Sequence, residues 1–244
     1  MINDDINQLL KNLHMAAMIG VVEQELARAQ KTKPSYADFY ARILREQYKL
    51  LRERSLEYRI RRARLPERWA LETFPFDAQP AVPAAVMRQH AELDFVVKKE
   101  NIVFVGPTGV GKTGLASALL LKALENGYRG LFVKAQDLFD EMYASLADRS
   151  SRKLLNHLMS VDVLLIDEMG YLNLRAEQTN LFFKLMEERY SRRSTLITTN
   201  LDYDDWYRFL GKKEMVGALL SRLRHHCHTL RIDGPSLRVP SNCA

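Results

Sequence analysis

The sequence has few of the features that mark secreted or membrane proteins. Its 244 residues include only two cysteines, Cys227 and Cys243. Because Cys243 is the penultimate residue, we expect no structural disulfide and a reducing compartment. No apolar run approaches the roughly 20 residues that a membrane-spanning helix needs. The first ten residues, MINDDINQLL, are too polar and acidic for a secretory signal. These absences predict a cytoplasmic protein without a membrane partner.

Composition and charge set wider limits. Lys and Arg number 36 against 30 Asp and Glu, a net charge of +6, and 47% of the residues are hydrophobic. That hydrophobic content suffices for one full-sized core and a smaller second unit. A basic excess favours polyanionic partners, although it does not by itself identify nucleic acid as one.

Glycine is almost absent from the first 73 residues, where Gly20 is the only one. Apolar residues recur there at helical spacing, which predicts a small all-helical N-terminal domain over residues 1–73. Ser35 and Asp38 have the spacing of a capping box, so a helix is expected to begin beside them and to run to Arg64, before Pro66.

Basic residues recur along the second half of that helix. Five of them fall on one face, at steps of 4, 3, 7 and 3: Arg45, Lys49, Arg52, Arg59 and Arg62. Such a stripe could contact the phosphates of double-stranded DNA. It could equally be a solvated face whose charges pair with nearby glutamates. A second basic segment, 146–153, offers an alternative DNA surface.

The pattern changes after a proline-containing stretch at 74–91, which is interpreted as a linker. From residue 92 to 244, short apolar runs alternate with helical periodicity. The runs predicted as strands are 102–105, 131–133, 161–166, 195–199 and 229–232, and the clearest helices are 113–125 and 175–190. This alternation predicts an α/β domain with a central parallel sheet flanked by helices.

A glycine-rich turn follows the first of these runs. Its spacing, G-x-x-x-x-G-K-T, is that of a phosphate-binding loop, in which backbone amides at a helix start cradle phosphates. The candidate nucleotide-binding residues are Gly106, Pro107, Thr108, Gly109, Val110, Gly111, Lys112, Thr113 and Gly114. Lys112 is expected at the β and γ phosphates of ATP and the Thr113 hydroxyl at Mg²⁺. The alternative is a glycine-rich turn that binds nothing.

Polar residues end two other predicted strands. Asp167 and Glu168 follow the run VLLI, at the sheet edge where α/β proteins collect ligands. Asp167 is the candidate Mg²⁺ ligand, and Glu168 is the candidate base that activates the attacking water. Asn200 ends the run STLITT and could orient that water or sense the γ-phosphate; alone, it could also be a turn residue or a helix cap.

These elements, in this order, resemble an AAA+ ATPase. Residues 194–238, the helical stretch 35–66 and the sequence FPFD at 74–77 further resemble the IstB-like transposition helper ATPases, relatives of the helicase loader DnaC and the initiator DnaA. The resemblance implies a protein that binds ATP, assembles on duplex DNA as a ring or helical oligomer, deforms it, and presents it to a partner transposase.

The family resemblance also suggests further roles. It implies an arginine that reaches the γ-phosphate of a neighbouring subunit, which would be Arg222 or, two positions further along, Arg224. Arg222 could instead be an ordinary surface arginine. Arg238 could contact the nucleotide or the next subunit. Gly114 departs from the histidine expected in much of the family, which weakens the first helical turn by about 0.5–1 kcal/mol. We also expect no C-terminal lid domain.

Two functional alternatives share the same ATPase motifs. One is a loader of a replicative helicase, and the other is a nucleotide-gated DNA-binding protein with negligible hydrolysis. A metal site at 225–228 (HHCH) is disfavoured, because four contiguous side chains diverge from one helix or strand and cannot converge on one ion.

Overall fold

The computed structural model describes residues 4–170, 173–211 and 213–238. The chain separates into two compact units, Met1–Tyr58 and Arg59–Ala244. None of the described helices is both long and apolar enough to cross a membrane.

The first unit is helical, as predicted. Its helices are α1 (Asp4–Asn12), α2 (Ile19–Thr32) and α3 (Tyr36–Arg62), which continues into the second unit, with a 3-10 turn η1 (Ala16–Met18). The Ser35 hydroxyl accepts a hydrogen bond from the Asp38 amide at 3.1 Å and donates to the Asp38 carboxylate at 2.6 Å, so the predicted cap is confirmed. Helix α3 ends two residues earlier than expected, because Arg64 adopts a left-handed conformation.

The second unit is built on a five-stranded sheet in the order β2-β3-β4-β1-β5, and every pairing is parallel. The strands are β1 (Asn101–Val105), β2 (Gly130–Lys134), β3 (Val163–Met169), β4 (Ser194–Thr199) and β5 (Cys227–Arg231). All five predicted runs coincide with strands. The largest difference is in β3, which continues three residues past Ile166 through an irregularity between Ile166 and Met169.

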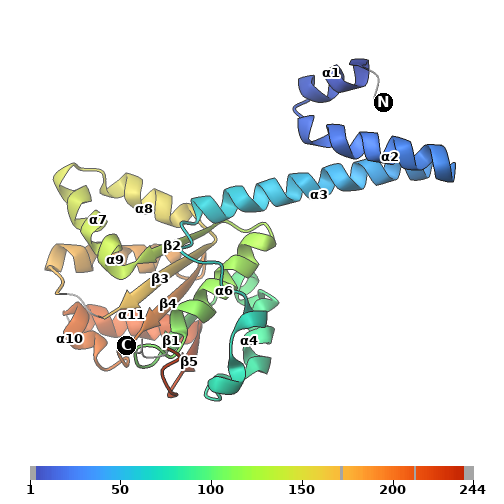
Figure 1. Cartoon of the computed structure of the whole chain (residues 1–244). Helices are drawn as coiled ribbons and strands as arrows, with labels where there is room; N and C mark the ends of the chain where they lie inside the picture. Colours follow the sequence, from blue (N-terminus) through green and yellow to red (C-terminus); the bar gives the residue numbers. More distant parts are fainter. Residues whose placement is uncertain (1–3, 171–172, 212, 239–244) are drawn as a thin grey trace, which may run out of the picture. The chain divides into compact units, whose positions relative to one another are not determined.

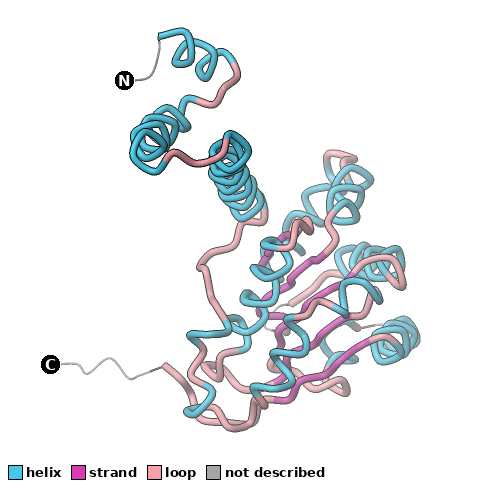
Figure 2. The backbone as a smooth tube through the Cα atoms, turned by 90° about the vertical axis from the view of Figure 1, so that its right-hand side faces the viewer, coloured by secondary structure: helices cyan, strands magenta, loops and turns pink. Residues whose placement is uncertain are grey.

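Helices cover both faces of this sheet (Figures 1 and 2). One face carries α4 (Ala84–Ala91), α5 (Asp94–Lys98) and α6 (Lys112–Glu125); the other carries α7 (Ala135–Ala147), α8 (Ser151–Ser160), α9 (Ala176–Arg189), α10 (Trp206–Leu210) and α11 (Lys213–His225). Alternate residues of β1 serve the two cores: Ile102 and Phe104 face the α6 side, while Val103 and Val105 face the α9 side. The α/β fold predicted from the sequence is confirmed.

The segment 74–91, interpreted from its prolines as a linker, packs as part of the second unit. Short 3-10 turns η2 (Leu71–Thr73) and η3 (Phe76–Ala78) precede α4. Phe74, Val82 and Met87 are buried in the α6-side core. The prolines therefore shape a covering segment rather than a free tether, because its apolar side chains find a core to enter. The division of the chain into functional parts at 73 and 91 stays a proposal.

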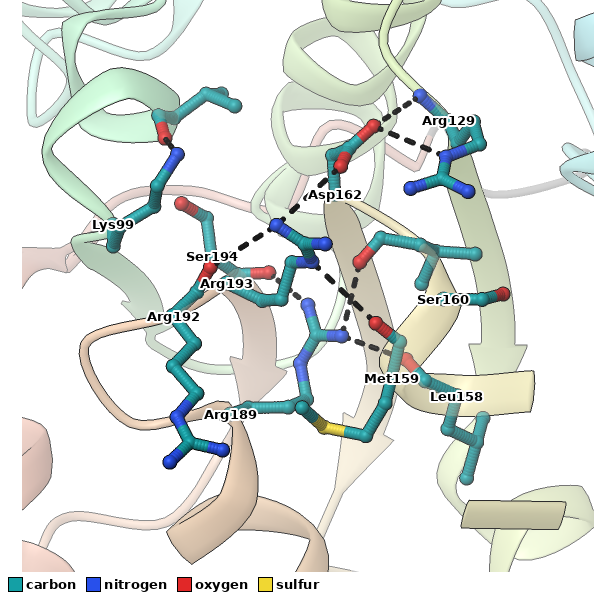
Figure 3. Close-up of polar contacts among 12 residues, drawn as sticks. Lys99, Arg129, Leu158, Met159, Ser160, Asp162, Arg189, Arg192, Arg193 and Ser194 are labelled. Carbon is teal, nitrogen blue, oxygen red and sulfur yellow. Dashed lines mark hydrogen bonds and ion pairs between the residues drawn. The ribbon is translucent and has the colours of Figure 1, made fainter. Parts of the chain in front are cut away.

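A buried arginine hydrogen-bonds to several carbonyl groups at the end of the sheet opposite the phosphate loop (Figure 3). Arg189, at the end of α9, donates hydrogen bonds to Leu158 O at 2.7 Å, Val161 O at 3.2 Å and Thr195 Oγ1 at 3.1 Å, and also to Ser194 O. These partners come from the end of α8 and the start of β4. Burial, reinforced by nearby Arg193, lowers the pKa of this guanidinium. The hydrogen bonds offset the cost of removing the charge from water.

Candidate functional site

The predicted phosphate loop lies between β1 and α6. Gly109 and Gly111 have φ angles of 89° and 96°, in the left-handed region that side chains strain. At Gly106 the constraint is space, since an added Cβ would overlap the Ile232 carbonyl. The glycines therefore let the backbone turn tightly and lie close to its neighbours, as the motif predicts.

The start of α6 is suited to an anion. Its N-cap is Gly111, which has no side chain to cap the helix, and the first amides of a helix have no partner inside it. Lys112 lies beside them, and its ammonium donates to Gly106 O at 2.8 Å and to Pro107 O at 2.7 Å. Partial burial lowers the pKa of Lys112, and Arg238 acts in the same direction, while Asp167 and Glu168 oppose the shift. An anion bound here would favour the charged lysine.

Three side chains from three elements converge next to the loop. Thr113 Oγ1, on α6, donates to Asp167 Oδ1 on β3 at 2.8 Å. Thr198 Oγ1, on β4, donates to the same oxygen at 2.5 Å. Asp167 is only 2% exposed, so its carboxylate is held in one orientation by these hydroxyls. The structure thus brings together the two residues predicted to bind metal.

Glu168 reaches the same edge because the strand is irregular there. In a regular strand, consecutive side chains point to opposite faces. Glu168 has a φ of 59°, and its amide donates to Thr198 Oγ1 at 2.9 Å. This bulge turns the Glu168 side chain toward the cavity beside Lys112. Its carboxylate is about half exposed and lies 3.8 Å from the ammonium of Lys134.

A cavity of about 560 Å³ joins these residues. Among the predicted site residues, its lining includes Thr108, Gly109, Gly111, Lys112, Thr113, Gly114, Glu168, Asn200 and Arg238. The Asn200 side-chain oxygen is buried and has no hydrogen-bond partner among the described residues. Such an atom favours a ligand-directed amide over the alternative turn or cap.

Sequence reasoning missed the residues that close the cavity. Trp69 and Phe74 line it from the segment before α4, and Leu237 lines it from the segment after β5. Leu237 N donates to Gly109 O at 2.8 Å, which ties the C-terminal segment to the phosphate loop. Gln79, fully buried, donates to Val110 O at 3.3 Å and Pro235 O at 3.0 Å, which joins all three segments. The FPFD sequence was the only local signal.

Other predicted site residues lie elsewhere. Arg222 is on α11 and pairs with Glu187 at 3.4 Å; it is not among the residues that line the cavity of its own chain. The side chain of Arg224 is outside the described part of the structure. In the basic stripe, Arg45, Lys49 and Arg52 are exposed on α3. Arg59 differs, because its Nε donates to Leu124 O, at the end of α6, at 2.8 Å. Arg62 is exposed and also has an interaction partner.

The residues of the HHCH sequence point to separate partners. His225 Nδ1 lies 3.1 Å from the Tyr190 hydroxyl, and His228 Nε2 lies 2.9 Å from the Glu100 carboxylate. Burial raises the pKa of the Cys227 thiol to about 11. Within the described ranges, no group of three or more His, Cys, Asp or Glu side chains could hold a metal ion.

The cavity fits a magnesium–nucleotide complex by its chemistry. The glycine turn and the start of α6 offer backbone amides to phosphates. The oxygens of Thr113 and Asp167 suit Mg²⁺, which binds few protein ligands and completes its shell with phosphate oxygens and water. Asn200 adds a polar side chain to the wall of the cavity.

Comparison with known proteins identifies the family. Residues 8–243 match the family described as IstB-like ATP binding protein. The chain belongs to this family. It is 36% identical over 96% of its length to a protein of Pseudomonas aeruginosa named as an ATP-binding protein of insertion sequence IS21, of which it covers 89%. It is 32% identical over 96% of its length to the corresponding protein of IS5376 from Geobacillus stearothermophilus, of which it covers 93%.

The fold of this IstB-like protein also matches solved AAA+ structures. The DnaC helicase loader aligns with a TM-score of 0.56 and 25% identity, over 67% of this chain and 96% of that one. A DnaA initiator bound to AMPPCP and single-stranded DNA aligns with the same TM-score at 23% identity, over 67% of this chain and 49% of that one, which shows the fold alone. The resemblance to AAA+ proteins inferred from the motifs is confirmed.

Proposed function

We propose that this IstB-like protein is a magnesium-dependent ATPase of the cytoplasm that assembles on duplex DNA and presents it to a partner transposase. The observation that supports it most is the cavity lined by the phosphate loop, Thr113 and Glu168, with the buried Asp167 hydrogen-bonded to Thr113. Insertion-sequence relatives that align over 96% of the chain supply the context of transposition.

In the proposed reaction each residue has a separate task. The Lys112 ammonium exchanges its two carbonyl acceptors for phosphate oxygens. Mg²⁺, when bound by Thr113 and Asp167, neutralises charge on the β and γ phosphates. Glu168 accepts a proton from the attacking water, and the Asn200 amide orients that water. Glu168 suits the role of base because the β-bulge turns its side chain into the cavity. Asp167 is buried and does not line the cavity.

Hydrolysis also needs a cation opposite the lysine, and we propose that a second copy supplies it. Arg222 is half exposed on α11 and is absent from the cavity of its own chain. An arginine given in trans would couple hydrolysis to assembly and could raise the rate by about 10³–10⁵. Self-association into a ring or a helical filament is therefore part of the proposal.

The proposed DNA surface is the exposed basic part of α3, represented by Arg45, Lys49 and Arg52. Tyrosines lie among them: Tyr48 is 63% exposed, and the Arg52 guanidinium lies 5.9 Å from its ring. Cations on one helix face can follow the phosphates of a duplex, and arginine stacked on an aromatic ring is partly held in place before binding.

Replacing Glu168 tests the enzymatic part. In E168Q we expect ATP affinity within about twofold of wild type, phosphate release at least about a hundredfold slower, and ATP-bound oligomers that persist on DNA. E177Q is the matched control, since Glu177 is exposed in the first turn of α9, away from the cavity. Measurable turnover that is unchanged in E168Q would reject Glu168 as the base. Negligible turnover in both proteins, with ATP-dependent DNA binding retained, would favour a nucleotide-gated DNA-binding protein.

A helicase loader is the second candidate, because the DnaC loader shares the fold. The insertion-sequence relatives favour transposition over it. The two roles separate experimentally by partner: a transposase encoded beside this gene, or a replicative helicase, should co-purify with the ATP-bound E168Q protein on DNA. Capture of the helicase alone would reject the transposition role.

A further inference from the structure

The indole of Trp69 lies over the first turn of α6. A Cβ added at Gly114 would be 3.3 Å from Cδ2 and 3.4 Å from Cε3 of the Trp69 ring. A larger side chain at this position would therefore push the indole away. Position 114 has glycine instead of the expected histidine, and the Trp69 ring occupies the space that a side chain there would need.

Trp69 is not simply a core residue. It is 40% exposed, whereas Trp206, the other tryptophan, is fully buried under the opposite face of the sheet. Trp69 lines the cavity of the phosphate loop and also a second cavity, of about 610 Å³, along the outer side of α6. The indole therefore separates two cavities. Phe74, which also lines the cavity of the phosphate loop, contacts the loop at Gly111.

Trp69 lies beside the place expected for the nucleoside end of a bound nucleotide. In the proposed function the terminal phosphates lie at Lys112 and Thr113, next to Asp167 and Glu168. Gly114 follows Thr113 along α6, and the cavity extends from these residues to the indole, where the ribose and base would follow the phosphates. A flat, partly exposed indole at that point offers a stacking face, which every purine can use.

We propose that Trp69 stacks on the purine base of the bound nucleotide, and that Gly114 is the small residue that allows the indole to lie there. This inference rests on the proposed nucleotide binding and adds to it a residue that recognises the base. Trp69 acts on affinity for the nucleoside part only; the phosphates are held by the loop.

Fluorescence gives the first test, because the chain has two tryptophans. Titrating full-length protein with MgATP should quench or shift the emission, and inorganic tripolyphosphate should not. In W69F the ATP-dependent change should disappear, because the remaining Trp206 is buried away from the cavity. ATP binding that leaves Trp69 emission unchanged would overturn the inference.

Affinity gives the second test, measured by calorimetry with ATP and with tripolyphosphate. W69A should weaken ATP binding by about ten- to a hundredfold, W69F by less, and neither should change tripolyphosphate binding more than about twofold. G114L should resemble W69A, because leucine favours the helix but displaces the ring. Circular dichroism checks that each variant is folded.

The outcomes separate this inference from the proposed function. Equal losses for ATP and tripolyphosphate in W69A would show that Trp69 only supports the loop, and the inference would fail while nucleotide binding stood. Wild-type protein that binds neither ligand would overturn both. A selective loss for ATP, reproduced by G114L, supports the inference.

Discussion

Thr113 and Asp167 lie 54 positions apart in the chain and are joined by a hydrogen bond of 2.8 Å from the threonine hydroxyl to the carboxylate. Thr198 donates to the same oxygen at 2.5 Å. Helix α6 and the neighbouring strands β3 and β4 thus place their hydroxyl and carboxylate groups at a single point beside the phosphate loop. We propose this pair as the place for a divalent ion, because each oxygen could exchange its present partner for the metal or for metal-bound water.

Removing the charge of Asp167 tests this arrangement. In D167N, which keeps the size of the side chain, we expect the Mg²⁺-dependent gain in ATP affinity to fall by about 10–100-fold. Affinity measured in EDTA should change by less than about twofold. D204N, at an exposed aspartate, is the control. Equal losses with and without Mg²⁺ would mean that Asp167 acts only by holding the loop in shape.

The lowered pKa of Lys112 predicts proton uptake on binding. Burial lowers this pKa in the free protein, and phosphate oxygens beside the ammonium would raise it again. At alkaline pH, between the lowered pKa and the ordinary value of 10.5, binding of MgATP should therefore take up protons, and affinity should fall as the pH rises further. Calorimetry in buffers of different ionisation enthalpy measures the uptake. K112R should lack it, because arginine stays charged over this range.

In the free protein, the charged form of Lys112 makes folding less favourable, because burial disfavours the ammonium. Because the pKa of Lys112 is lowered in the folded state, the unfolded chain binds more protons at alkaline pH. The contribution of Lys112 to the free energy of unfolding therefore rises with pH, through the lowered pKa up to the ordinary value of 10.5. In the calorimetric binding experiment, net release of protons when ATP binds would contradict the expected position of the phosphates beside Lys112.

The basic residues of α3 should fall into two groups. Arg45, Lys49 and Arg52 are exposed, and replacing one that contacts a phosphate should lower the slope of log affinity against log salt by about 0.9. Arg59 donates to Leu124 O, so R59A should lower the melting temperature as well as, or instead of, the slope. Gel-shift titrations on duplex DNA and thermal unfolding measure the two effects. Unchanged slopes for all of them would move the DNA surface to the segment 146–153.

Arg189 should matter for stability and Arg192 should not. R189M leaves the buried carbonyls of Leu158, Val161 and Ser194 without a donor, so we expect a loss of about 3–5 kcal/mol in the free energy of unfolding. The guanidinium of Arg192 points away from this cluster (Figure 3), and R192M should stay within about 0.5 kcal/mol of wild type. Urea unfolding followed by circular dichroism compares the two. Similar losses would contradict the role given to Arg189.

Local patterns were sufficient to predict the strands and the glycine-rich turn between β1 and α6. The strand at 102–105 and the glycine turn after it can be recognised from residues that are adjacent in the sequence, because an apolar run and the spacing of glycines are local patterns. Asp167 and Glu168 were also found, although the bulge that turns Glu168 toward the cavity was not. A left-handed glutamate depends on the hydrogen bond from its amide to Thr198, 30 positions away.

The walls of the cavity could not be predicted in the same way. Gln79 joins Val110 and Pro235 across 31 and 156 positions of the chain, and a single buried glutamine leaves no periodic pattern. The prolines at 74–91 favoured a linker, because proline breaks regular structure whether the segment is free or packed. The burial of Phe74 and Met87 decides between these two, and it is a tertiary property.

Cys227 should react slowly with alkylating reagents. Burial raises the pKa of its thiol from the ordinary value of 9.0 to about 11, which lowers the thiolate fraction at pH 8 by about a hundredfold, and the thiolate is the reactive form. In a C243A variant, which leaves one thiol, iodoacetamide should modify folded protein about a hundredfold more slowly than protein in urea. Mass spectrometry measures both rates.

The pH profile of the same reaction fixes the cause. With the thiol buried, the rate for folded protein should keep rising through about pH 11, whereas the rate in urea should level off near pH 9. A raised pKa also means that the contribution of Cys227 to stability is full below pH 9.0 and is lost as the pH passes through 11. A profile that levels off at the same pH in both states would mean that slow modification comes from restricted access alone, because access changes the height of the curve but not its midpoint.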